Sequence, residues 1–158
     1  MIINIASTKE ELHQIVQEEL AQAKANITEN IEREGKRASG KTAEGMAITV
    51  ADEGAGVVGT LSGRAYFSAL ETGSKPWRNQ YKSAPKFFAD IIAEWANAKG
   101  VTANPYAIAT KIMREGTKQH RDGPITSVFS EEIDATYGRI EKRVMLLFDT
   151  ILTESLKR

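Results

Sequence analysis

Two long amphipathic segments, one near each end of the chain, constrain the fold more than any other feature of this sequence. In the first, apolar residues recur at three- and four-residue spacing from Leu12 to Ile31, and Gly35 follows as a helix stop. Ser7 or Thr8 is expected to cap this helix. In the second segment, from Ser130 to about Ser155, apolar residues step by four and three as in an a/d seam, namely Ile133, Tyr137, Ile140, Val144, Leu147 and Ile151. Each pattern predicts a long helix with one buried face.

The residues between these segments predict a β-hairpin followed by short helices. Alternation over 46–50, turn chemistry over 52–56 and an apolar run over 57–61 are typical of two antiparallel strands. Glycines then mark the ends of three short helices, at Gly73, Gly100 and Gly116. The expected inward faces of the second and third are Phe88, Ile91, Ile92 and Trp95, and Tyr106, Ile108, Ile112 and Met113. Residues 35–45, 73–83 and 117–129 are predicted to be loops.

These elements predict one domain over residues 1–158, because a chain of 158 residues can build a single substantial core. The predicted fold class is α+β. Long N- and C-terminal helices and short middle helices pack with a small antiparallel β-hairpin or sheet.

Residue types suited to catalysis are sparse. The two histidines, His13 and His120, lie far apart without a second ligand at metal-binding spacing, and there is no cysteine. The segment Gly54–Gly59 has the letters of a dinucleotide loop, but it lies between two expected strands and predicts a hairpin turn instead. No apolar run approaches the roughly 20 residues of a membrane span. We therefore expect a soluble protein with no catalytic residue, metal site or cofactor, no small-molecule substrate and no membrane partner.

A basic and aromatic segment over residues 64–86 is the main candidate for binding. Trp77 and Tyr81 interleave there with five basic residues, against the single acid Glu71. The mixture suits nucleic-acid stacking and phosphate contact, a protein–protein hot spot, or a tryptophan that packs in the core. Because Lys plus Arg (21) equals Asp plus Glu (21), a nucleic-acid role would need a local basic patch. With a second basic cluster downstream, the candidate interface residues are Arg64, Lys75, Trp77, Arg78, Tyr81, Lys82, Lys111, Arg114, Lys118 and Arg121.

Motifs follow one another in a fixed order over about residues 60–135. Residues 65–73 (AYFSALETG) place a tyrosine before Leu-Glu and a glycine turn, and residues 84–86 (APK) open a helix that ends EWANAKG. Residues 107–117 (AIATKIMREGT) and the VFS of residues 128–130 come next. In order and spacing they resemble the tail-completion, or neck, proteins of long-tailed phages and prophages. The loop after Gly73 is longer and more basic-aromatic than in the shortest members.

The resemblance implies a structural protein of virion assembly, a subunit of the head–tail connector that forms an oligomeric ring and catalyses no reaction. Its implied partners are further copies of itself and other neck or tail proteins, with possible contact to DNA in the channel. The implied location is the virion, after synthesis in the cytoplasm of the bacterial host. Two other functions stay open from the residues alone. They are a nucleic-acid-binding accessory protein that uses residues 64–86 and 111–121, and a small cytoplasmic regulatory interaction domain.

Overall fold

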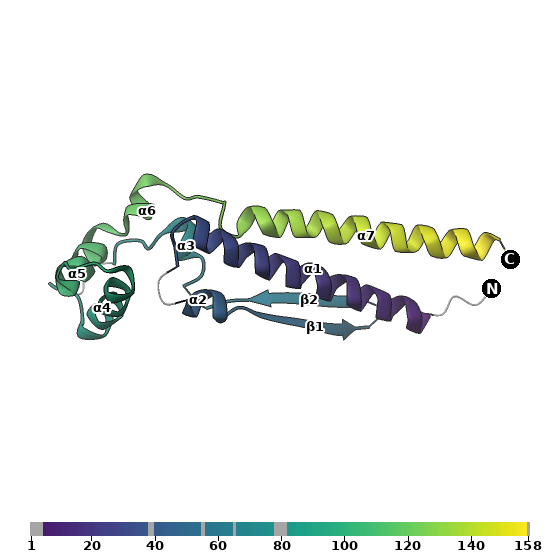
Figure 1. The fold of residues 1–158 in the computed structure, drawn as a ribbon, viewed down its shortest axis with the longest axis horizontal. Coiled ribbons are helices and arrows are strands. Elements are labelled where there is room, and N and C mark those ends of the chain that lie inside the picture. The colour runs from purple at the N-terminus through teal and green to yellow at the C-terminus, as the bar shows by residue number, and fades with distance from the viewer. Residues whose placement is uncertain (1–4, 38–39, 55, 65, 78–81, 158) are drawn as a thin grey trace.

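The chain forms an elongated α+β structure in which the two long helices run antiparallel (Figure 1). The computed structural model describes residues 5–37, 40–54, 56–64, 66–77 and 82–157. Helix α1 (Ile5–Arg33) and helix α7 (Ser130–Leu156) lie side by side, so both termini are at the same end of the molecule. The predicted fold class and the two predicted long helices are confirmed.

A two-stranded antiparallel sheet packs along α1 (Figure 1). Strands β1 (Ala47–Glu53) and β2 (Gly56–Ser62) pair in the register Val50 to Gly59. Residues 56–59 thus belong to an antiparallel strand, which is not the strand–helix setting of a dinucleotide loop; Ala55, in the predicted turn, lies outside the described residues. A Cβ atom on Gly59 would lie 2.4 Å from Val16 and 2.7 Å from Leu20 of α1. Glycine at this position therefore lets the strand approach the helix closely.

The middle of the chain forms a small lobe beyond the C-terminal end of α1 (Figure 1). It contains α4 (Lys86–Lys99), α5 (Pro105–Glu115) and α6 (Lys118–Asp122). Asn104 caps α5 by accepting the backbone N–H groups of Tyr106 and Ala107. Buried residues Ala84, Ala89, Ile92 and Ala109 form the lobe's own core. We call residues 73–123 the lobe, and the rest of the described chain the stem.

A second core lies inside the stem, at the end where α1 finishes and α7 begins. Buried Ile27 and Ile31 of α1 meet Met46 and Val128 there, and half-buried Phe67 and Phe129 pack against them. Two one-turn helices, α2 (Lys41–Glu44) and α3 (Ala69–Thr72), complete the stem. The ends of both long helices are thus fixed by apolar burial.

Several sequence-based details differ from the structure. Helix α1 begins at Ile5, so Ser7 and Thr8 lie in its first turns instead of capping it. The predicted loops 35–45 and 117–129 contain the short helices α2 and α6. Tyr106 was expected to face inward, but it is exposed, and Ala109 and Met113 form the buried side of α5.

The predicted seam of α7 is wrong at one position and marginal at another. Tyr137 is 70% exposed and Ile133 is also exposed, whereas the neighbouring Thr136 is buried. The hydroxyl of Thr136 donates to the carbonyl of Glu132 and accepts a hydrogen bond from Arg139, so this buried hydroxyl has hydrogen-bond partners. Ile140, Val144, Leu147 and Ile151 are half-buried, as the seam predicts.

Candidate interaction surfaces

Helix α4 has two apolar faces, and only one of them is covered. Its buried face consists of Ala89, Ile92 and Ala96. Phe87, Ile91 and Trp95 are 40–61% exposed. Sequence periodicity placed Ile91 and Trp95 in the core, and the structure corrects this, because small alanines supply the close contact with α5. An exposed aromatic and aliphatic row of this kind is typical of an interaction site.

Trp77 extends the exposed row of α4. Its ring stacks 6.3 Å from that of Phe87 and lies 4.9 Å from that of Phe88, and its backbone N–H donates to the carbonyl of Met113. The side chain is half-buried, so Trp77 both packs on the lobe and remains accessible. We call Trp77, Phe87, Ile91 and Trp95 the lobe surface.

The two predicted basic clusters meet at the lobe. The guanidinium of Arg114 donates to the carbonyl of Lys82 at 2.7 Å, which joins the second cluster to the first. Arg121 pairs with Glu115 at 3.0 Å and Lys118 with Asp122 at 3.5 Å. Lys75 and Lys111 are exposed, and neither forms an ion pair within the described residues.

One further predicted interface residue lies away from the lobe, in the stem. Arg64 lies after β2 in the stem, where it donates to the hydroxyl of Tyr66 at 3.3 Å. Arg78 and Tyr81 lie outside the residues that the structure describes.

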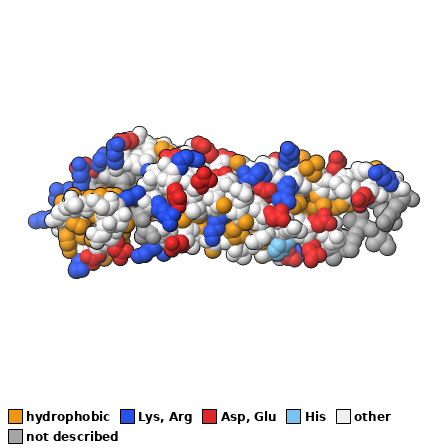
Figure 2. Space-filling model, in the orientation of Figure 1, with side chains coloured by type: hydrophobic (Ala, Val, Ile, Leu, Met, Phe, Trp, Pro, Cys, Tyr) orange, Lys and Arg blue, Asp and Glu red, His pale blue; other side chains and the backbone are white. Residues whose placement is uncertain are grey.

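Charge is divided unequally between the lobe and the rest of the chain. Residues 73–123 contain nine Lys and Arg against four Asp and Glu, a net charge of +5. Residues 1–72 and 124–158 contain twelve against seventeen, a net charge of −5. Figure 2 shows Lys and Arg side chains gathered at the lobe end, next to exposed hydrophobic side chains. The overall neutrality of the sequence conceals this polarity.

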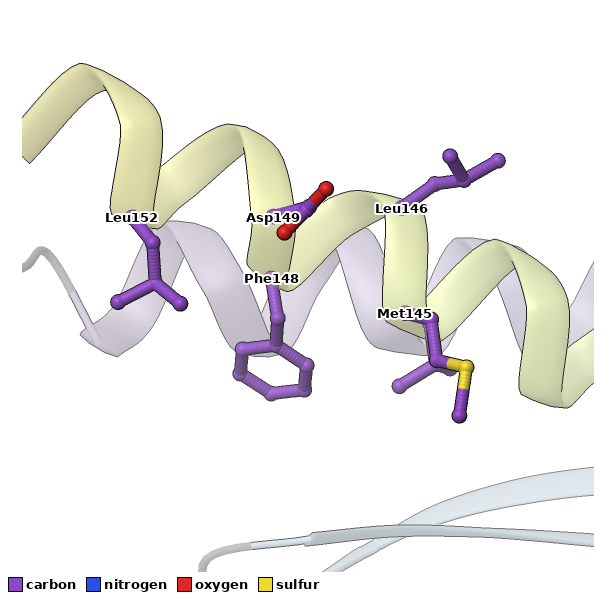
Figure 3. Close-up of a pocket in the computed structure, with 6 residues that line it drawn as sticks. Met145, Leu146, Phe148, Asp149 and Leu152 are labelled. Atoms are coloured by element: carbon purple, nitrogen blue, oxygen red, sulfur yellow. The ribbon is translucent and has the colours of Figure 1, made fainter.

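A second exposed apolar row lies on the C-terminal half of α7. Met145, Phe148, Leu152 and Leu156 are 46–85% exposed, and we call them the α7 stripe. Met145, Phe148 and Leu152 point from the same side of the helix, whereas Leu146 points from the other (Figure 3). Asp149 adjoins the row and lines the same shallow hollow. Sequence reasoning missed this stripe because the half-buried seam next to it carried the stronger heptad pattern.

A buried charge network joins α1 to α7. Glu19, only 8% exposed, accepts bonds from Arg139 at 2.7 Å and from Arg143 at 3.0 Å, and Arg143 also reaches Glu18. Burial raises the pKa of Glu19, but the hydrogen bonds from the two arginines outweigh it and leave that pKa below its usual range. The same hydrogen bonds raise the pKa of both arginines, so the network is fully ionised near neutral pH.

Glu71 is a buried carboxylate at the beginning of α7. Its Oε1 atom accepts the backbone N–H groups of Val128 (3.1 Å), Phe129 (2.7 Å) and Ser130 (2.9 Å), and the Ser130 hydroxyl donates to Oε2. An anion in this position satisfies unpaired helix N–H groups and complements the helix dipole. The Leu-Glu-Thr-Gly motif is therefore a structural joint, 57 residues or more from its partners in sequence.

Gly73 and Ser74, which follow this joint in the chain, contact the beginning of α6. Gly73 has a φ of 69°, and a Cβ atom there would lie 2.4 Å from both the Thr117 hydroxyl and the His120 backbone nitrogen. The backbone N–H of Ser74 donates to the Thr117 hydroxyl, and the Thr117 N–H donates back to the Ser74 carbonyl. Two of the motifs on which the resemblance is based, residues 71–73 and 115–117, are therefore in contact at their glycine ends.

The histidines occupy separate places. The Nδ1 atom of His13 lies 3.5 Å from Oδ1 of Asp52 in the hairpin, and His120 is half-buried beside Gly73 and Gly116. Within the described ranges, no group of three or more His, Cys, Asp or Glu side chains is placed to hold a metal ion. Among the helices described, none is both long and apolar enough to cross a bilayer.

Comparison of the chain with protein-family models, with curated proteins and with solved structures gives no match. The motifs over residues 60–135 and the surfaces described above are thus the grounds on which a function is argued.

Proposed function

We propose that this chain is a structural subunit of the phage head–tail neck, of the tail-completion type, which associates with its own copies in a ring and catalyses no reaction. The observation that carries the proposal is the pair of exposed apolar rows, one on the lobe and one on α7, in an elongated chain of divided charge. A ring subunit needs two different surfaces that fit each other, because rings close through heterologous contacts.

The joint at Glu71 supports the same proposal. An assembly subunit must hold its contact surfaces at a fixed spacing. Glu71 binds the beginning of α7, and the contacts of Lys36 with Gln119 and of Lys99 with the Gly35 carbonyl, both 2.8 Å, join the lobe to the stem. The same proposal places the chain in the virion, as one copy of a ring that binds other neck proteins.

Light scattering of the purified chain over a concentration series tests the ring. One particle of constant mass, equal to a whole number of subunits above two, is the expected result, and negative-stain images should show a closed ring. A strict dimer would contradict the proposal.

Deletion of the gene from its phage or prophage tests the role in the neck. Filled heads and free tails should then accumulate separately, and the wild-type chain supplied in trans should restore joining. Normal yields of joined particles without the gene would contradict a neck function.

The charge of the lobe favours one second candidate, a nucleic-acid-binding function. A net charge of +5 over residues 73–123 supplies the local basic patch that such a function needs. Binding to DNA or RNA should weaken steeply with salt and weaken further in a Lys82→Glu, Lys111→Glu double variant. Affinity that is insensitive to both would reject this candidate, and a Lys157→Glu variant in the stem is the matched control.

A further inference from the structure

The lobe surface and the α7 stripe have matching spacing. Phe87, Ile91 and Trp95 are four residues apart on α4, and Phe148, Leu152 and Leu156 are four residues apart on α7. At 1.5 Å per residue, each row is about 12 Å long. Rows of i±4 side chains form ridges that fit the grooves of another helix carrying the same rows. The two rows are therefore suited to pack against each other.

The two rows cannot meet within one chain, because they lie near opposite ends of the molecule (Figure 1). Helix α4 belongs to the lobe, whereas the C-terminal half of α7 lies beside the N-terminal half of α1 at the far end of the stem. Contact between them requires a second copy.

Charge complementarity supports the same pairing. Exposed Lys82 and its neighbour Arg114 lie in the lobe, whose net charge is +5, whereas Lys86, next to Phe87, is paired with Asp90 at 2.8 Å. Asp149 adjoins the α7 stripe, and exposed Glu10 and Glu11 lie in the adjacent first half of α1; residues 1–72 and 124–158 together have a net charge of −5. A lobe-to-lobe or stem-to-stem pair would bring like charges together, whereas lobe-to-stem contact brings opposite charges together.

We infer that the lobe surface of one copy docks on the α7 stripe of the next copy, in a head-to-tail contact. This inference rests on the proposed function, since it assigns the surfaces through which the ring closes. Trp77, Phe87, Ile91 and Trp95 supply the anchor side chains, and the basic residues around them form the polar rim.

A mixing experiment with two single variants separates this contact from symmetric ones. Ile91→Glu blocks the lobe surface, and Leu152→Glu blocks the α7 stripe; both side chains are more than half exposed, so the fold is kept. Each variant alone should be a monomer, with a dissociation constant raised by about tenfold or more. An equimolar mixture should form dimers and nothing larger, because one intact contact remains between the two variants. Val58→Glu, on the exposed side of β2, is the matched control and should assemble as the wild type does.

Symmetric contacts give a different pattern. If α7 stripes paired with each other, Ile91→Glu would still self-associate and Leu152→Glu would not; lobe–lobe pairing would give the reverse. Either pattern overturns the inference.

Cysteine cross-linking makes the test independent of affinity, since the chain contains no cysteine. Chains with Ile91→Cys and chains with Leu152→Cys are mixed in equal amounts and oxidised at high concentration. The mixed disulfide should greatly exceed the roughly one half of cross-linked product expected from random pairing. A mixed disulfide at or below one half of the cross-linked product overturns the inference. This criterion also applies if the wild-type protein is monomeric by light scattering.

The head-to-tail contact and the ring can be refuted separately. A closed ring whose cross-links join identical positions refutes this contact and leaves the proposed function in place. Head-to-tail cross-links in open chains of growing mass confirm the contact and contradict the ring.

Discussion

Removal of the Glu71 carboxylate should destabilise the protein by about 2–5 kcal/mol. Glu71 is 3% exposed and accepts three backbone N–H groups and one hydroxyl. In Glu71→Ala, the buried N–H of Val128 loses its only described partner, at a cost of roughly 1–3 kcal/mol. Loss of the bonds to the half-buried Phe129 and Ser130 and of the charge at the helix N-terminus adds about 1–2 kcal/mol.

Glu71→Gln separates charge from shape. The amide oxygen can still accept the backbone bonds, but bonds to a neutral acceptor are about half as strong, so the loss should be about 1–2 kcal/mol. Glu29→Gln removes a charge from an exposed position of α1 and should change stability by less than about 0.5 kcal/mol.

Urea unfolding followed by circular dichroism measures these changes, and hydrogen exchange at residues 128–130 measures their location. Amide protection at these three residues should fall more than elsewhere in Glu71→Ala. The reasoning is refuted if Glu71→Ala unfolds at the same urea concentration as Glu29→Gln, or if exchange at 128–130 is unchanged.

Three further predictions use contrasts within the chain. Because the pKa of Glu19 is lowered in the folded state, its ionised carboxylate stabilises the fold at neutral pH, and this stabilisation is lost as the pH falls below about 4.3, the ordinary glutamate pKa. In a plot of the free energy of unfolding against pH, Glu19→Gln should therefore show a smaller decrease on the acid side. Gly59→Ala should cost about 1–3 kcal/mol through overlap with α1, whereas Gly56→Ala, whose added Cβ would meet nothing closer than 3.7 Å, should be nearly neutral in thermal unfolding. Gly73→Ala should cost more than Gly100→Ala in urea unfolding, since the φ angles are alike, 69° and 68°, but only the first Cβ overlaps other atoms; equal losses would show that backbone conformation alone is responsible.

Periodicity and glycine positions were sufficient to predict the longer elements of the fold, but not the short helices α2 and α6. The hairpin, α4, α5 and α7 follow from alternation, four-residue spacing and helix-stopping glycines such as Gly100 and Gly116. These signals are local, because each depends on residues within a few turns of one another.

Features that depend on distant contacts were not predictable. Ile91 and Trp95 share the periodicity of a core face, but the core between α4 and α5 is formed by Ala89 and Ala109 with Ile92. Periodicity does not distinguish these two alanines from exposed ones. Thr136 is buried in place of Tyr137 because Arg139 and the α1 carboxylates require polar partners. The role of Glu71 depends on residues 128–130, and no local pattern connects them.

The joint also makes the lobe a self-contained excursion of the chain. The polypeptide leaves the stem after Glu71 and returns at Ile125, whose N–H donates to the Glu71 carbonyl at 3.1 Å, so the entry and the exit are bonded to each other. Because the ends of the excursion are fixed, its closure costs little extra as its length changes. The lobe can therefore lengthen, shorten or change its surface chemistry in evolution while the paired helices and the hairpin stay the same. The sequence of the lobe, which would contact a neighbouring subunit, can then change independently of the sequence of the stem.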